Sequence, residues 1–161
     1  MNFEQFQQNV QTWAAARGIY EHSTPLAQAL KAVSEVGELA DAVIKKDMDA
    51  LRDAIGDVAV CLVNWAHMFG CKVTTGPLME NTGTAVPAQV LAADVAYLVG
   101  YVVRRTTYRT AAPNTAHRAL HTLQILARNS GLTFEECCQQ AWDEIKDRTG
   151  HMVAGGAFVK D

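Results

Sequence analysis

The chain has 161 residues, of which 49% are hydrophobic and 19% charged, and its formal net charge is −3. This length and composition suit one globular domain, 1–161, with a hydrophobic core. The weak acidic balance gives no electrostatic footprint for nucleic acid, and no apolar run approaches the roughly 18 residues of a membrane span. The first residues do not join a basic segment to an apolar one, so we expect no signal peptide.

Most of the chain repeats hydrophobic residues every three or four positions, which indicates an all-α fold. The predicted helices span about 3–17, 25–46, 49–70, 88–108, 115–129 and 133–148. Pro25 suits a first helical turn, and Thr133 with Glu136 fits a capping box. Glycines and prolines mark about 71–87 as a loop insertion. The glycine-rich tail, 149–161, is expected to be irregular, and no useful strand pattern is present.

The four cysteines are Cys61, Cys71, Cys137 and Cys138, and none forms a Cys-x-x-Cys pair. This spacing is not typical of a disulfide framework or a zinc ribbon. We therefore expect reduced, largely buried thiols in a cytoplasmic protein.

Acidic residues recur on the second and third predicted helices. Glu35 and Glu38 are three apart and share a helical face with Lys31. Alone, such a pair is more typical of a solvated helix surface. Asp57 is harder to explain as surface decoration, because it opens the most apolar helix and a charge there needs a partner or a metal.

The turn between these helices is short, so they should be antiparallel neighbours. Asp53 lies one turn before Asp57, and Asn64 follows on the same side. The hairpin would then gather three or four carboxylates, which repel one another. A hard cation such as Mg²⁺ or Mn²⁺ relieves that repulsion, and oxygen ligands suit it.

Three motifs follow in order along the first half of the chain: Gln28-Ala29-Leu30-Lys31, Glu35-Val36-Gly37-Glu38-Leu39 and Asp53-Ala54-Ile55-Gly56-Asp57-Val58. Together they resemble the MazG-like all-α nucleoside triphosphate pyrophosphohydrolases, especially the short phage forms. The runs 142–150 and 156–160 also resemble the closing segment of those forms. The middle of the chain carries no such resemblance.

The resemblance implies a helical bundle, with a four-helix core plus extra helices, that assembles as a dimer or a dimer of dimers. It implies hydrolysis of a (deoxy)nucleoside triphosphate, with dGTP as one candidate, to the monophosphate and pyrophosphate. For a phage protein this would occur in the host cytoplasm. Glu35, Glu38 and Asp57 would hold Mg²⁺ or Mn²⁺. In this chain Ala54 occupies the first position of the family's second acidic pair. Two questions stay open: whether Asp53 replaces the missing carboxylate, and how many ions bind.

Further roles follow from the chemistry of triphosphate hydrolysis, which needs positioning, charge neutralisation and an oriented water. Glu35 or Glu38 would accept the proton, and Lys31 would assist. Phosphate oxygens would be held by Lys31, Lys146 and Arg148, although the last two equally suit a helix C-terminus. The base and sugar would contact Asn9, Trp13, Gln28 and Asn64, although Trp13 also fits the apolar core.

Two other classes of function remain as alternatives. An inactive helical interaction protein is favoured only by Ala54. A di-iron carboxylate bundle needs Glu-x-x-His pairs, and neither Glu35 nor Glu38 has a histidine three residues later. His117 and His121 are four apart but lack an acidic partner of known spacing. Three arginines, at 104, 105 and 109, fit a helix C-terminus better than a ligand site.

Overall fold

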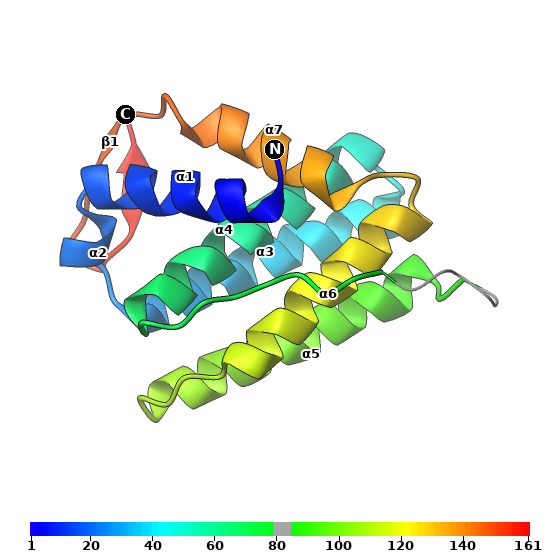
Figure 1. The fold of residues 1–161 in the computed structure, drawn as a ribbon, viewed down its shortest axis with the longest axis horizontal. Helices are drawn as coiled ribbons and strands as arrows, with labels where there is room; N and C mark the ends of the chain where they lie inside the picture. The colour runs from blue at the N-terminus through cyan, green and yellow to red at the C-terminus, as the bar shows by residue number, and fades with distance from the viewer. Residues whose placement is uncertain (79–84) are drawn as a thin grey trace.

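The computed structural model describes residues 1–78 and 85–161. Within these residues the fold is all-α, as predicted, with a small antiparallel hairpin at the C-terminal end (Figure 1). The helices are α1 (Phe3–Ala16), α2 (Ile19–His22), α3 (Pro25–Lys45), α4 (Met48–Met68), α5 (Ala88–Thr107), α6 (Pro113–Asn129) and α7 (Phe134–Ile145). The strands are β1 (Gly150–Met152) and β2 (Phe158–Lys160).

Side-chain caps fix where several helices begin. Asn2 and Thr24 accept backbone N–H groups at the starts of α1 and α3, while Asp47 and Thr133 do so for α4 and α7. Each cap satisfies a backbone donor that has no partner inside the helix. Lys46, at φ 56°, reverses the chain between α3 and α4. These two long helices therefore form the antiparallel hairpin expected from the short turn.

The helix α4 lies at the centre of the molecule, because α3 packs on one side of it and α7 on another (Figure 1). The helix α1 crosses both α4 and α7, whereas α5 packs against α3 and α6. Side chains such as Ile55, Leu62 and Trp65 of α4 are completely buried. Buried side chains from all seven described helices join one hydrophobic core, which fixes the α3–α4 hairpin in place.

Two expectations about the chain are wrong. The connector after the first helix contains the short helix α2, in which Tyr20 contacts the core. The tail is not wholly irregular, because Gly150 pairs with Lys160 and Met152 with Phe158 in the β1–β2 hairpin. The glycine-rich turn at 153–157 hid this hairpin, since three-residue strands carry too little alternation to be recognised.

The loop predicted at 71–87 has no regular secondary structure at 71–78 and 85–87, and its remaining residues lie outside the described part. Val73 is fully buried, and its carbonyl accepts a hydrogen bond from Gln7 of α1.

The four cysteines are free and three of them are buried. No helix in the described residues has the length and hydropathy to cross a membrane.

Candidate active site

A pocket of about 790 Å³ opens where α3, α4, the end of α7 and the C-terminal hairpin meet. This volume is in the range of small-molecule sites. The pocket brings together nine of the eleven site residues predicted from the sequence: Trp13, Gln28, Lys31, Glu35, Glu38, Asp53, Asp57, Asn64 and Arg148. Most of the predicted site residues therefore share one pocket.

The other two predicted residues do not line this pocket. The amide nitrogen of Asn9 lies 3.1 Å from the sulfur of Met1. Lys146 pairs with Asp143 at 2.7 Å, within its own helix end. Asn9 on α1 is therefore directed to the start of the chain, and both Asn9 and Lys146 lie outside the pocket that the other predicted residues share.

The α3 wall of the pocket joins a buried carboxylate to a lysine. Glu35 is only 4% exposed and forms an ion pair with Lys31, one turn earlier on the helix. Burial would lower the pKa of Lys31, but the hydrogen bond and the charge of Glu35 outweigh it and hold that pKa above its ordinary value. Glu38, by contrast, is exposed at the pocket edge. The two glutamates of the motif therefore have different environments.

Asp57 lies on the α4 wall, surrounded by buried apolar neighbours. Burial is the main reason that its pKa rises to about 7. Nearby carboxylates add to this rise, whereas the guanidinium of Arg148 opposes it. The contributing carboxylates are those of Glu35, Asp53 and Glu144. Gathering acidic groups in this way costs free energy unless a proton or a cation compensates.

Asp53 lines the pocket, whereas Ala54 faces the core with only 3% of its surface exposed. A carboxylate at position 54 would thus be buried away from the pocket. Burial raises the pKa of Asp53, and the neighbouring Glu144 raises it further, while a hydrogen bond from Gln140 acts in the opposite direction. Asp53 is therefore the acidic residue that this α4 helix turns toward the pocket one turn before Asp57.

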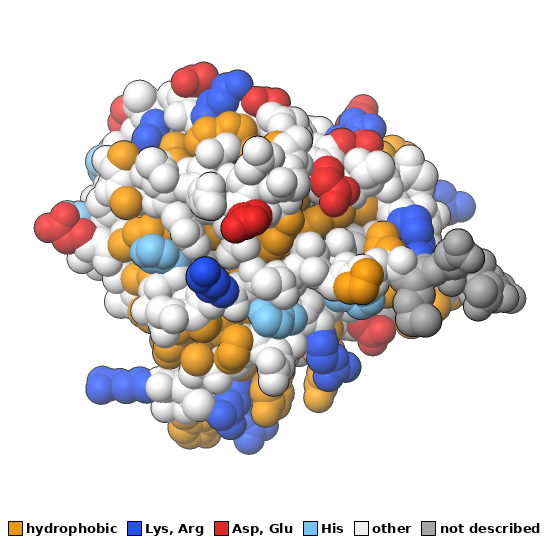
Figure 2. Space-filling model, viewed as in Figure 1, with side chains coloured by type: hydrophobic (Ala, Val, Ile, Leu, Met, Phe, Trp, Pro, Cys, Tyr) orange, Lys and Arg blue, Asp and Glu red, His pale blue; other side chains and the backbone are white. Residues whose placement is uncertain are grey.

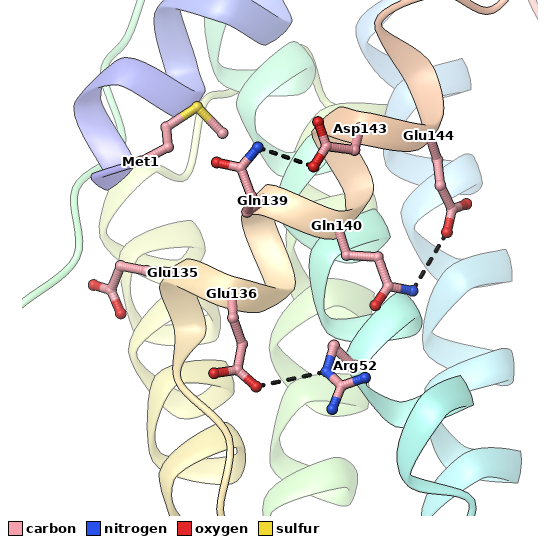
Figure 3. A pocket seen from close by; sticks show the side chains of 8 residues that line it. All are labelled: Met1, Arg52, Glu135, Glu136, Gln139, Gln140, Asp143 and Glu144. Carbon is pink, nitrogen blue, oxygen red and sulfur yellow. Dashed lines mark hydrogen bonds and ion pairs between the residues drawn. The ribbon is translucent and has the colours of Figure 1, made fainter.

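Sequence reasoning missed a fifth carboxylate in the pocket, that of Glu144 on α7. Gln140 and Glu144 project from the same side of α7, and the Gln140 amide donates to Glu144 at 3.3 Å (Figure 3). Glu144 also lines a neighbouring pocket on the outer face of α7, which contains Arg52 and Glu136 (Figure 3). The spacing along α7 could indicate its face, but only the packing of α7 on α4 brings it to Asp53.

The deep end of the pocket carries amide groups. Asn64 is 2% exposed, and its Oδ1 accepts a hydrogen bond of 2.7 Å from the Tyr20 hydroxyl. This bond leaves the Asn64 amide N–H groups without a partner among the described residues. Gln28 donates to Ser23 at 3.1 Å, which leaves its carbonyl oxygen as an acceptor. The pocket therefore combines a charged end with a neutral end capable of both donating and accepting.

The C-terminal hairpin covers one side of the pocket. Phe158 packs edge-on against Trp13, with 5.7 Å between ring centroids, and Arg17 donates to the carbonyl of Arg148 at 2.8 Å. Trp13 is 7% exposed, so its core placement is confirmed, but it also lines the pocket. In the described residues, Trp13 Nε1 is the one side-chain polar atom that has neither contact with solvent nor a hydrogen-bond partner.

These residues fit a hard divalent cation in donor type, because five carboxylates share one pocket. The raised pKa of Asp57 shows that its charged form costs free energy in this pocket. A bound cation would remove that cost. The side chains are not gathered into a closed site, however: the described residues contain no group of three His, Cys, Asp or Glu arranged to hold an ion. Glu35, for example, is engaged by Lys31.

Comparison with known proteins agrees with the motifs on this hairpin. Residues 23–73, which include α3 and α4, match the MazG nucleotide pyrophosphohydrolase domain. This match covers less than half of the chain. The matched segment supplies Glu35, Glu38, Asp53 and Asp57, whereas Glu144 and Arg148 lie outside it.

One relative among curated proteins is an uncharacterized 18.2 kDa protein from the rep-hol intergenic region of Haemophilus phage HP1. It is 39% identical over 62 residues, and this aligned part is 38% of the present chain and 38% of the relative. No solved structure matches the chain. The family match thus covers the α3–α4 hairpin, and the aligned part of the relative covers well under half of either protein.

Proposed function

We propose that the protein hydrolyses a nucleoside triphosphate, preferably a deoxynucleotide such as dGTP, to the monophosphate and pyrophosphate. The observation that carries this proposal is the convergence of Glu35, Glu38, Asp53 and Asp57 in one pocket of the MazG-like hairpin. A host-cytoplasmic location would follow if the protein is phage-encoded, as the relative is. We also propose that residues 1–161 act as one domain, because all the described helices share one core.

Mg²⁺ or Mn²⁺ would be held by Glu35, Glu38 and Asp57, with Asp53 beside them. The ion would neutralise charge on the phosphates and polarise a water molecule. Release of Glu35 from Lys31 would make its carboxylate available to the ion. Lys31, which is 58% exposed, would then be free to contact a phosphate oxygen.

The reaction requires water to form a bond to a phosphorus atom beside the α–β bridging oxygen, while the bond from phosphorus to that oxygen breaks. Glu38 is the better placed of the two motif glutamates to accept the proton of water, because it is exposed at the pocket edge and has no ion-pair partner among the described residues. Arg148 lines the same pocket and would hold the leaving pyrophosphate by charge-assisted hydrogen bonds.

The nucleoside would lie toward the neutral end of the pocket. Asn64 offers amide donors and Gln28 a carbonyl acceptor, a combination that can pair with the edge of a base. Trp13 and Phe158 add aromatic surface, against which a base or sugar can pack. Because these groups are buried, a base that left them unpaired would bind less tightly.

The proposed assembly is a homodimer, which could associate further into a tetramer, through the exposed face of α5. Hydrophobic side chains lie between Lys and Arg side chains at the lower edge of the molecule, where α5 runs (Figures 1 and 2). Large exposed hydrophobic residues on α5 and its C-cap are Val90, Tyr97, Tyr101 and Tyr108, and the adjacent α3 adds Leu30, Val33 and Ile44. Exposed apolar surface of this extent is typical of an interface.

A second copy fits this face because its sequence is self-complementary. If two α5 helices cross antiparallel near residue 99, Tyr97 of each meets Tyr101 of the other, and Val90 meets Tyr108. The same register places Asp94 opposite Arg104. Neither of these charged side chains has an ion-pair partner among the described residues of one chain. A two-fold interface requires this reciprocal pairing.

The proposed activity is tested by incubating the purified protein with each of the eight common (d)NTPs and Mg²⁺ or Mn²⁺. We expect equal amounts of monophosphate and pyrophosphate from at least one nucleotide, and loss of both products in Glu38→Gln. Glu135→Gln is a matched control, because Glu135 is exposed on α7 and does not line the pocket. Absence of turnover with every nucleotide would overturn the proposal and favour an inactive interaction protein.

A further inference from the structure

The carboxylate of Glu144 belongs to a helix outside the matched hairpin, yet it lies beside the hairpin's acidic residues. One amide nitrogen, that of Gln140, is 3.5 Å from Asp53 Oδ1 and 3.3 Å from Glu144 Oε1. Besides burial, the proximity of Glu144 also contributes to the raised pKa of Asp53. A single neutral donor thus bridges two acidic side chains from two helices.

Close packing of α7 on α4 brings Glu144 to this position. A Cβ atom on Gly56 would lie 2.5 Å from the Cys137 carbonyl oxygen and 2.7 Å from Ala141 Cβ. Only a residue without a side chain permits this approach. Glu144 follows Ala141 by three residues and Cys137 by seven, so it continues the same face of α7. The glycine inside the acidic motif of α4 therefore determines how near Glu144 lies to Asp53.

We propose that Glu144 is a further metal-ligating residue of this pocket and that it acts together with Asp53. This inference rests on the proposed function, because the ion is the one that the hydrolysis requires. Ala54 cannot contribute a carboxylate, and its side chain points into the core. Glu144 of α7 would join Asp53 of α4 and supply a second carboxylate that the α3–α4 hairpin lacks at this end of the site.

A cation bound by these two groups would replace the weak bridge made by Gln140. Carboxylates favour a hard divalent ion over a neutral amide donor, because the ion compensates both negative charges. The same ion would link α7 to α4. Because the C-terminal hairpin follows α7, the ion would also fix the hairpin over the pocket. Glu144 would then couple ion binding to the position of Arg148, four residues later along the chain.

The test is Mn²⁺ binding to the full-length protein without nucleotide, measured by titration calorimetry. Glu144→Gln should weaken the binding by about tenfold or more, by analogy with the loss of groups that support metal ligands. The matched control Glu135→Gln should bind as the wild type does. Thermal unfolding with and without Mn²⁺ gives a second readout, in which Glu144→Gln should lose part of the wild-type stabilisation.

Unchanged Mn²⁺ affinity in Glu144→Gln would overturn the role of Glu144, and the proposed hydrolysis would still stand if the wild type releases pyrophosphate. A wild-type protein that binds no Mn²⁺ and hydrolyses no nucleotide would overturn both. If Glu144→Gln does not fold, Glu144→Asp supplies the comparison, because it keeps the charge but withdraws the carboxylate from Asp53. Binding of Mn²⁺ to Glu144→Asp with wild-type affinity would then contradict the proposal.

Discussion

Replacement of Gly56 by alanine tests the contact on which the α7 side of the pocket depends. The added Cβ would lie 2.5 Å from a backbone oxygen and 2.7 Å from a methyl group, whereas real Cβ contacts are essentially never below 3.0 Å. Both neighbours are rigid parts of α7, so the helix itself must shift. Overpacking of this kind costs about 1–3 kcal/mol, and the involvement of backbone places Gly56→Ala near the upper end.

Alanine has a higher helix propensity than glycine by about 1 kcal/mol, which offsets part of the steric cost. The net loss of unfolding free energy should therefore be about 2 kcal/mol, or about 4–8 °C in Tm for a chain of this size. Urea denaturation followed by circular dichroism measures it. Because α7 carries Glu144, the shift should also reduce any pyrophosphate release.

Gly37→Ala is the matched control, since Gly37 lies in the middle of α3 and a Cβ there meets nothing within 4 Å. This variant should be as stable as the wild type or more stable by up to about 1 kcal/mol. Equal stability of Gly56→Ala and Gly37→Ala would refute the steric argument. It would also show that Gly56 does not determine how near Glu144 lies to Asp53.

Three further predictions concern other parts of the site and the surface. Asp57→Asn should stabilise the protein in EDTA above pH 7. The folded state raises the Asp57 pKa from 3.8 to about 7, so the free energy of unfolding falls as the pH rises through this range, and the asparagine removes that loss. The gain in unfolding free energy is at most about 4 kcal/mol, and solvent in the pocket reduces it. Equal stability of Asp57→Asn and the wild type at pH 8 would contradict this prediction. Asn64→Ala should cost about 1–3 kcal/mol because it leaves the half-buried Tyr20 hydroxyl without its partner. The double change Asn64→Ala with Tyr20→Phe should cost less than the sum of the single changes in urea denaturation. Tyr97→Glu should convert dimer to monomer in sedimentation velocity, whereas an unchanged sedimentation coefficient of a wild-type dimer would exclude the α5 interface.

The sequence allowed the long helices to be predicted within a few residues, because apolar periodicity and side-chain caps are local signals. The shared face of Lys31 and Glu35 was also predictable from helical spacing alone. The hairpin placed both beside Asp57, as the short connection between α3 and α4 requires. These features depend on residues that are near one another in the chain.

Features that depend on distant contacts could not be predicted. Nothing in the local pattern indicates that Tyr20 reaches Asn64, or that Gly56 admits α7 so closely. The helical pattern of the sequence does not single out Glu144, and its proximity to Asp53 appears only in the packed structure. Asn9 was assigned toward the pocket by its position on the first helix, but the rotation of α1 places it beside Met1.

The most direct test of the account is the identity of the products formed from a nucleoside triphosphate with Mg²⁺, separated by anion-exchange chromatography. The account predicts monophosphate and pyrophosphate in equal amounts, with both lost in Asp57→Asn although that variant is folded and more stable without metal. Release of diphosphate and inorganic phosphate, or equal product formation by Asp57→Asn, would contradict it.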